Sequence, residues 1–209
     1  MKTGILFDLD GTLLNTLEDL VDATNYALEA HGYPPRTKAE IRRFVGNGAA
    51  NQIRLSLPEG SCEEEVQAVL NTYKPYYTAN CQRKTAPYPG IMEALAALDG
   101  KYPMAIVSNK PDAAVKALCA DFFPGIYALG ERADCPRKPA ADMVFKAMSA
   151  IGADSCIYVG DSEVDVITAN NAGVPCLSVL WGFRDREDLE GGIFCETVEN
   201  LETVIQSVI

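Results

Sequence analysis

Residues 4–12 read GILFDLDGT, an apolar run followed by two carboxylates one residue apart. The run from Gly4 to Phe7 predicts a fully buried β-strand. Because side chains alternate faces along a strand, Asp8 and Asp10 are expected to point the same way off its end. Two carboxylates this close resist joint ionisation unless a cation or a shared proton relieves them.

This carboxylate pair predicts catalysis more readily than a structural role. The simplest use is one carboxylate as nucleophile and the other as proton donor and acceptor, with a divalent ion holding them. Gly11 lets the backbone turn sharply and approach a ligand closely. We therefore take Asp8 and Asp10 as the candidate catalytic residues.

Composition narrows the classes of protein that the chain can be. Its 209 residues are 48% hydrophobic, which allows one sizeable core, or a core with a small appended domain. The formal net charge of -11 argues against general binding to nucleic acid or to anionic membranes, both of which need cationic patches. A small anionic substrate needs only a local positive site and stays possible.

Cysteine and histidine usage point to a reducing compartment. Seven cysteines are scattered without C-x-x-C spacing, which predicts free thiols in a cytoplasmic protein. His31 is the sole histidine and precedes a helix stop, so a zinc site is not expected and His31 is predicted to be a surface residue. No signal peptide is visible, and no apolar run approaches the roughly 20 residues that span a bilayer.

Helix-like and strand-like segments alternate along the chain, with one helical interruption from Leu17 to Asn80. Within that block, residues 37–40 and 61–64 each predict a capping box, and residues 45–48 (VGNG) predict a turn before a short helix. We predict that residues 15–86 form a small all-helical unit inserted after the first strand. Residues 1–14 and 87–209 then form the main unit.

The main unit is predicted to be an α/β, Rossmann-like parallel sheet with helices on both faces. Expected strands span residues 4–7, 104–107, 126–129, 156–159 and 176–180, and expected helices span 91–98, 113–119, 140–151, 164–172 and 201–208. Ligands of such sheets bind at the carboxyl ends of the strands.

Polar groups follow several of these strands at that end. Besides Asp8 and Asp10, these are Ser108-Asn109, Lys138 before Pro139, and the pair Asp161 and Asp165. Taken singly, Ser108-Asn109 could be a helix cap, Lys138 a solvated loop lysine, and the aspartates part of a turn and a first helical turn. Together they supply what a phosphate monoester site needs: hydrogen-bond donors, one cation, and oxygen ligands for Mg²⁺.

In order along the chain, DLDGT at 8–12, Ser108-Asn109, Lys138-Pro139 and GDxxxD at 160–165 resemble the four motifs of the haloacid dehalogenase-like hydrolase superfamily. The resemblance covers essentially the whole chain, and the helical insert resembles the four-helix cap domain of that superfamily. Within it, the chain is most similar to phosphoglycolate phosphatases.

The resemblance implies a role for each matching residue. Asp8 would attack phosphorus, and Asp10 would protonate the leaving oxygen and then activate water. Mg²⁺ would be held by Asp8, the backbone carbonyl of Asp10, Asp161 and Asp165. The phosphoryl group would be bound by three residues: Ser108, Asn109 and Lys138.

The implied activity is a Mg²⁺-dependent phosphatase acting on a small phosphorylated metabolite. Asp10 argues against carbon–halogen cleavage, because haloacid dehalogenases do not use aspartate at that position. A phosphosugar mutase similar to β-phosphoglucomutase and a non-catalytic binding scaffold are the alternatives. The leaving group is left open between phosphoglycolate, a nucleotide, pyrophosphate and a phosphosugar, and so is the oligomeric state. The helical insert is expected to close over the site by hinging near residues 14–16 and 85–87.

Overall fold

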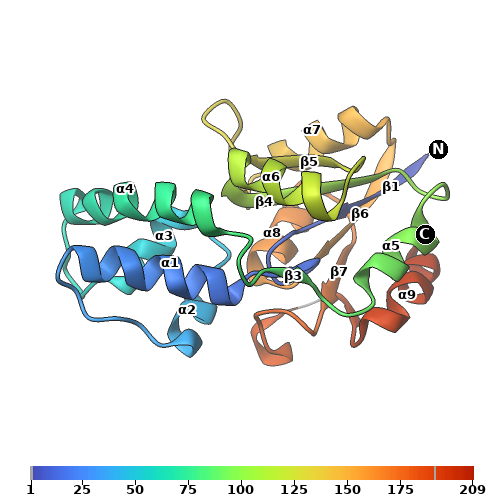
Figure 1. Cartoon of the computed structure of the whole chain (residues 1–209). Coiled ribbons are helices and arrows are strands. Elements are labelled where there is room, and N and C mark those ends of the chain that lie inside the picture. Colours follow the sequence, from blue (N-terminus) through green and yellow to red (C-terminus); the bar gives the residue numbers. More distant parts are fainter. Residues whose placement is uncertain (1, 191) are drawn as a thin grey trace.

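The computed structural model describes residues 2–190 and 192–209. Its centre is a six-stranded parallel sheet with the strand order β5-β4-β1-β6-β7-β8 (Figure 1). The strands are β1 (Thr3–Phe7), β4 (Met104–Pro111), β5 (Tyr127–Glu131), β6 (Ser155–Gly160), β7 (Cys176–Val179) and β8 (Ile193–Cys195). The predicted α/β class with a parallel sheet is confirmed.

Helices follow the strands as the alternating pattern predicts. They are α5 (Ile91–Leu98), α6 (Asp112–Phe122), α7 (Asp142–Ile151), α8 (Glu163–Ala172) and α9 (Leu201–Val208), with short 3₁₀ segments η1 (Arg186–Asp188) and η2 (Val198–Asn200). The edge strand β8 was not predicted, because three residues are too few to show a strand period.

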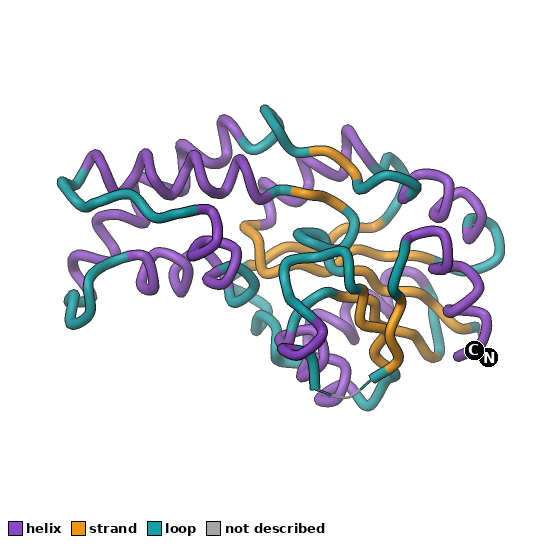
Figure 2. The backbone as a smooth tube through the Cα atoms, turned by 90° about the horizontal axis from the view of Figure 1, so that it is seen from below, coloured by secondary structure: helices purple, strands orange, loops and turns teal. Residues whose placement is uncertain are grey.

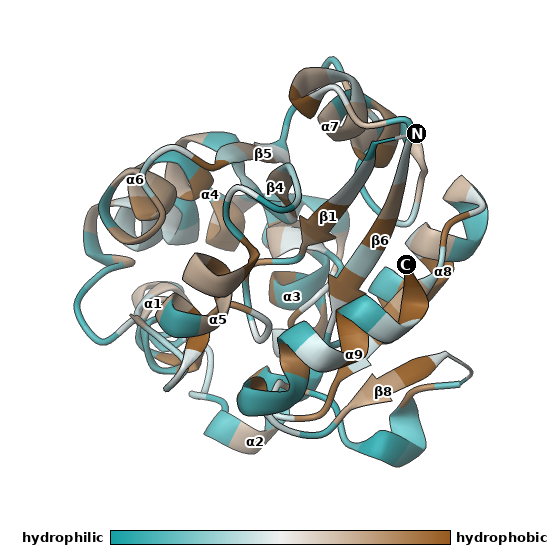
Figure 3. Cartoon of the chain, turned by 90° about the vertical axis from the view of Figure 1, so that its right-hand side faces the viewer, coloured by the Kyte–Doolittle hydropathy of each residue, from teal (hydrophilic) through white to brown (hydrophobic). Residues whose placement is uncertain are grey.

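Both faces of the sheet are covered. On β1, Leu6 packs in one apolar cluster with residues of α7 and α8. Ile5 and Phe7 belong to the cluster on the opposite face, which includes residues of α5, α6 and α9. Figure 3 shows β1 and β6 as hydrophobic strands between these layers. Burial on both faces explains why the strand pattern in the sequence is a continuous apolar run rather than an alternation.

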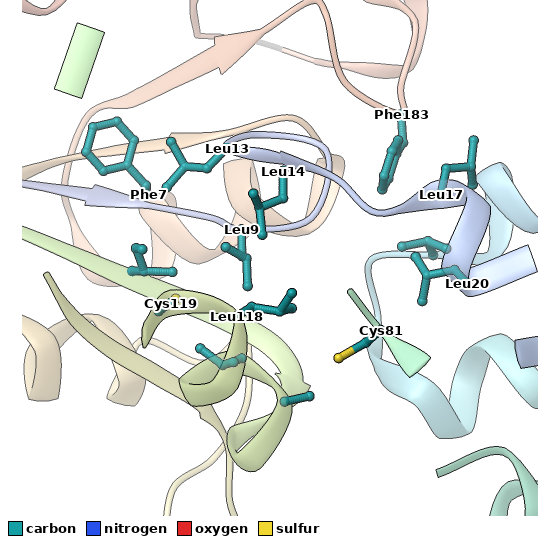
Figure 4. Close-up of a cluster of buried hydrophobic side chains, with 14 of the residues drawn as sticks. Phe7, Leu9, Leu13, Leu14, Leu17, Leu20, Cys81, Leu118, Cys119 and Phe183 are labelled. Atoms are coloured by element: carbon teal, nitrogen blue, oxygen red, sulfur yellow. The ribbon is translucent and has the colours of Figure 1, made fainter. Parts of the chain in front are cut away.

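The predicted helical insert consists of α1 (Leu17–Ala30), α2 (Lys38–Phe44), α3 (Gly48–Ser56) and α4 (Glu63–Asn80). These helices form a separate cluster beside the carboxyl ends of the central strands, as the views in Figures 1 and 2 agree. Apolar side chains continue from Phe7 through Leu9 and Leu14 to Leu17 and Leu20, so one core connects the sheet to the helices (Figure 4). The division into two domains at residues 15 and 86 stays a prediction.

The helix starts test the two predicted capping boxes. The box at Thr37 and Glu40 is confirmed, with both reciprocal hydrogen bonds present. The second box was misplaced by one residue. The helix begins at Glu63, and the Glu65 carboxylate accepts from the backbone N of Cys62 at 2.8 Å, so Cys62 rather than Ser61 occupies the cap position.

Other expectations for the helical part and the thiols hold. His31 is exposed at the end of α1, where its Nε2 lies 2.8 Å from Thr72 Oγ1. All seven cysteines are free thiols, and only Cys62 is exposed. Across residues 2–190 and 192–209, none of the helices has both the length and the apolar character needed to cross a membrane.

The two chain segments that join the helices to the sheet lie side by side. Leu14 pairs with Pro87 and Asn15 with Ala86, which makes the short antiparallel ribbon β2 (Leu14–Asn15) and β3 (Ala86–Pro87). These are the segments predicted as hinges. Just beyond the ribbon, the buried Asp19 carboxylate of α1 accepts from both backbone N–H groups of Lys84 and Thr85 and from the Thr85 hydroxyl, at 2.8–3.1 Å.

We predict that Asp19→Ala lowers the free energy of unfolding by about 3 kcal/mol, because it leaves two backbone N–H donors without the acceptor that Asp19 now provides. Thermal unfolding is the measurement. The matched control is Asp22→Ala on the same helix. Asp22 pairs with Lys84 at 2.6 Å on the surface, and its loss is expected to cost less than about 1 kcal/mol. Equal losses in the two variants would contradict this account.

Candidate active site

The structure brings the predicted site residues together at the carboxyl ends of β1, β4 and β6. β1 lies at the centre of the sheet. After β1 the chain adds β4 and β5 on one side, and it then crosses to the other side of β1 to add β6. This reversal of strand order leaves a crevice at the strand ends, which is where open parallel sheets bind ligands. Asp8 follows β1, Ser108 and Asn109 lie in the end of β4, and Asp161 follows β6.

The Lys138 ammonium is the centre of this arrangement. Its Nζ donates to Asp8 Oδ1 at 2.7 Å and to Asp165 Oδ1 at 2.8 Å, and it lies 2.9 Å from the Tyr158 hydroxyl. Lys138 lies in a loop but is 2% exposed, so the alternative of a solvated lysine is wrong. The bond to Asp8 Oδ1 leaves Asp8 Oδ2 without a hydrogen bond among the described residues, and Asp8 itself lines a cavity.

Burial shifts the titration of these groups. Desolvation raises the pKa of Asp8 to about 7, against the lowering effect of Lys138, and the charges of Asp165 and Asp10 add to the rise. Desolvation and the charge of Asp8 likewise raise the pKa of Asp161 well above its usual value. Without a further cation, this cluster therefore holds protons near neutral pH.

The carboxylates of Asp8, Asp161 and Asp165 each place one oxygen within 4.8 Å of the other two. When all three carboxylates are ionised, the ammonium of Lys138 offsets only one of their negative charges. One divalent cation would balance the remaining two. Carboxylate oxygens are the ligands that Mg²⁺ prefers. The donor set therefore fits a hard divalent ion, as predicted for Asp161 and Asp165.

Two contacts and one glycine hold Asp161 in place. Its Oδ2 accepts from the backbone N of Phe183 at 2.7 Å, and its Oδ1 accepts from the Thr12 hydroxyl at 3.3 Å. Gly11 has φ +87°, and a Cβ there would lie 2.2 Å from the Asp161 carboxylate. Only glycine fits there, which confirms the sharp turn expected of Gly11; the group that its backbone approaches closely is the Asp161 carboxylate.

Asp10 lies outside this carboxylate cluster. Lys110 Nζ donates to its two oxygens at 2.6 and 2.8 Å, and the Thr16 hydroxyl donates to Oδ1 at 2.6 Å. Lys110 is 6% exposed and was assigned no role from the sequence. Its position directly after Ser108-Asn109 was the available signal. The burial of a lysine at that point cannot be inferred from spacing alone.

Ser108 and Asn109 lie beside the cluster, and the Asn109 amide is already engaged. Asn109 Nδ2 donates to the backbone carbonyls of Lys138 at 2.9 Å and Gly46 at 3.2 Å, which uses both of its hydrogens. In this arrangement the Asn109 side chain connects the turn before α3 to Lys138, and binding a phosphoryl group through Nδ2 would require release of one carbonyl. Ser108 Oγ accepts from the backbone N of Lys110 at 3.2 Å, and its hydroxyl hydrogen is free to donate.

The loop after β7, whose Phe183 backbone N donates to Asp161, also contacts the helical insert. Arg184, 8% exposed, donates to the backbone carbonyls of Arg42 at 2.9 Å and Val45 at 2.7 Å. Arg42 in turn pairs with Asp185 at 3.0 Å. Arg42 therefore binds the sheet domain at the edge of the site and is absent from the wall of the small cavity described next.

A cavity of about 40 Å³ lies between the strand ends and the helices. Asp8, Asp10, Ser108, Asn109, Lys110 and Asp161 contribute its sheet side. Residues of the insert close it from the other side: Leu20, Val45, Gly46, Gly48, Ala49, Gln52, Tyr73 and Tyr77. The cavity is therefore walled by the strand ends on one side and by the insert on the other.

Comparisons with known proteins identify the family. Residues 5–179 match the family model described as haloacid dehalogenase-like hydrolase. The chain is 35% identical to the phosphoglycolate phosphatase of Rhodobacter capsulatus over 88% of this chain and 87% of that protein. It is 31% identical to phosphoglycolate phosphatase 1 of Pseudomonas aeruginosa over 96% of this chain and 78% of that protein.

A solved structure shows the same architecture. The crystal structure of a Lactobacillus delbrueckii subsp. bulgaricus protein, provisionally assigned as a phosphoglycolate phosphatase, superposes with a TM-score of 0.92. The two chains are 37% identical, and the match covers 98% of this chain and 99% of the other.

The raised pKa of Asp8 makes metal binding dependent on pH. In the metal-free protein the proton on Asp8 stabilises the fold, and this stabilisation is lost as pH rises from about 4 through about 7. A divalent ion must displace that proton. We predict that excess Mg²⁺ raises the melting temperature more at about pH 8 than at about pH 6, as thermal unfolding would show.

The control for this prediction is Asp161→Asn, which removes one carboxylate of the cluster and is expected to abolish the Mg²⁺-dependent gain at both pH values. A gain that is equal at the two pH values, or that survives in the variant, would mean that the ion binds elsewhere.

Proposed function

The chain belongs to the haloacid dehalogenase-like hydrolase family, and on that premise we propose that it is a Mg²⁺-dependent phosphatase of small phosphorylated metabolites, similar to phosphoglycolate phosphatases. The observation that carries the proposal is the buried Lys138 between Asp8 and Asp165, with Asp161 completing the carboxylate cluster. A buried charge cluster of this kind is costly in a purely structural role.

In the first step, Asp8 Oδ2 attacks the phosphorus atom of the substrate. The bond between phosphorus and the leaving oxygen breaks, and Asp10 transfers a proton to that oxygen, so the alcohol departs and an aspartyl-phosphate remains on Asp8. Lys138 bonds to the other oxygen of Asp8, so it holds the nucleophile in position and offsets its charge.

In the second step, Asp10, now ionised, removes a proton from water, and the resulting hydroxide attacks phosphorus. The bond to Asp8 breaks, which releases phosphate and regenerates the free carboxylate. Asp8, Asp161, Asp165 and the Asp10 backbone carbonyl are the proposed ligands of Mg²⁺, which when bound offsets negative charge on the transferring phosphoryl group. Ser108 is the proposed phosphoryl donor, together with Lys138 and, once a carbonyl is released, Asn109.

We also propose that residues 15–86 act as a cap domain that excludes bulk water. Its α1, α3 and α4 helices supply one wall of the cavity through residues such as Leu20, Ala49 and Tyr77. A cap that opens would admit substrate and then water. The paired segments β2 and β3 are the proposed hinges.

The proposed substrate is a phosphomonoester of a short alcohol, with phosphoglycolate as the leading candidate. The named relatives support this choice. The acidic chain, at -11, fits a small-molecule partner better than a nucleic acid or an anionic membrane.

We predict that Asp8→Asn abolishes phosphate release, by at least about 1,000-fold, because an amide cannot act as the nucleophile. Release should be measured from a panel that includes phosphoglycolate, with Mg²⁺ and with chelator. The control Asp121→Asn changes an exposed carboxylate on α6 and should leave turnover unchanged. Turnover retained in Asp8→Asn would disprove the mechanism.

The mutase alternative is separated by its product. With β-glucose 1-phosphate and a bisphosphate primer, the proposed phosphatase is expected to release free phosphate and form no glucose 6-phosphate. Formation of glucose 6-phosphate would show that the chain returns the phosphoryl group to sugar instead of to water.

A further inference from the structure

We propose that the Tyr77 hydroxyl recognises the substrate by donating a hydrogen bond to a carboxylate oxygen on the leaving group. The inference rests on the proposed phosphatase function and extends it to a specificity residue on α4. Tyr77 is 2% exposed, it lines the cavity, and its hydroxyl has no hydrogen-bond partner among the described residues.

Unpartnered polar groups gather at this cavity. Across residues 2–190 and 192–209, three buried side-chain atoms lack a partner, and two of them, Tyr77 Oη and Asn109 Oδ1, belong to residues that line it. Buried polar groups are nearly always satisfied in folded proteins, so two exceptions at one cavity indicate groups kept for a ligand. Tyr77 is the member of this pair that lies on the helical insert.

The position of Tyr77 places it on the leaving-group side of the reaction. Asp10, the proposed proton donor to the leaving oxygen, is bonded to Lys110 at 2.6 Å. Lys110 Nζ lies 4.7 Å from the centre of the Tyr77 ring. Tyr77 therefore lies next to Lys110, the partner of the proposed proton donor Asp10, and so on the side of the cavity where the leaving group is expected.

The surroundings of Tyr77 favour an anionic acceptor. The Lys110 ammonium is positive, and the positive end of α3 borders the same cavity at Gly48 and Ala49. Asn47, at the N-cap position just before α3, makes no side-chain capping bond, so it does not satisfy the first backbone N–H groups of the helix. Part of the remaining wall is apolar, as at Leu20 and Val45.

The hydroxyl is also in the right protonation state to donate. Burial and the nearby charge of Asp10 raise the pKa of Tyr77 well above its usual value. The neutral phenol therefore keeps its proton throughout the range in which the enzyme would work.

The test compares Tyr77→Phe with the parent chain on two substrates. Phosphoglycolate and ethyl phosphate differ in that the first carries a carboxylate where the second carries a methyl group. We expect kcat/KM for phosphoglycolate to fall about 10- to 100-fold, the range for a hydrogen bond to a charged group, and kcat/KM for ethyl phosphate to stay within about threefold.

The matched control is Tyr76→Phe, which removes a hydroxyl from the preceding residue of α4. Tyr76 stacks on Tyr26, with ring centres 3.8 Å apart, and does not line the cavity. The Tyr76→Phe variant should leave kcat/KM unchanged for both substrates. The melting temperature of Tyr77→Phe should equal or exceed that of the parent chain, because the variant removes an unsatisfied buried group. Equal losses on both substrates with a lower melting temperature would show a packing role and overturn the proposal.

Binding separates this proposal from the proposed function. In the Asp8→Asn background, calorimetry should show that adding Tyr77→Phe weakens phosphoglycolate binding by a similar factor and leaves ethyl phosphate binding unchanged. If the parent chain hydrolyses neither substrate, the phosphatase function fails and the binding result alone decides the role of Tyr77. An unchanged affinity for phosphoglycolate, or no binding of it, would overturn that role.

Discussion

The contact of the Lys138 ammonium with Asp8 and Asp165 is the interaction on which the site depends. At 2.7 and 2.8 Å, and almost fully buried, it joins the end of β1 to the start of α8 through a loop residue. Removing either partner would leave a buried charge without compensation, which is among the costliest changes that a folded protein can suffer. The ion pair therefore fixes Asp8, the proposed nucleophile, and Asp165, a proposed metal ligand, relative to each other before any substrate binds.

The parallel sheet explains why such a cluster can exist. Neighbouring strands end at the same edge, so residues that are 150 or more apart in sequence, such as Asp8 and Asp161, meet where β1 and β6 stop. Gly11 provides the space that their approach requires. The same edge faces the helical insert, so chemistry and leaving-group recognition are supplied by different parts of the chain. The proposed division of labour assigns Asp8 and Asp10 to the reaction and Tyr77 to recognition.

Much of this could be predicted from the sequence, because the relevant signals are local. The apolar run before Asp8 indicated a buried strand, and the alternation of segments indicated a parallel sheet, which together put the four polar groups at one edge. The short strand β8 was missed, and the start of the helix at Glu63 was misplaced by one residue. The three residues of β8 are too few to show a strand periodicity. Ser61 and Cys62 are both possible cap residues, and the sequence does not show which of them occupies the cap position.

The contacts between the insert and the sheet were beyond the sequence. Lys110 could be placed after the strand predicted at 104–107, but its burial against Asp10 and Tyr77 depends on how α4 packs. The same holds for Asn109, whose amide bonds to carbonyls of Lys138 and Gly46, and for Arg184, which bonds to the insert. Such contacts join residues far apart in sequence, and no spacing rule reports them. Lys110, Asn109 and Gly46 also line the cavity, so their contacts help to shape it.

The most direct test of the central claim is to identify the residue that carries the phosphoryl group during turnover. The enzyme would be mixed with phosphoglycolate and Mg²⁺, quenched rapidly in acid, and treated with borohydride, which reduces an acyl phosphate to the alcohol. Peptide mass spectrometry should then find homoserine in place of aspartate at position 8. Under conditions in which phosphate is released, an unmodified Asp8, or reduction at another carboxylate, would contradict the account.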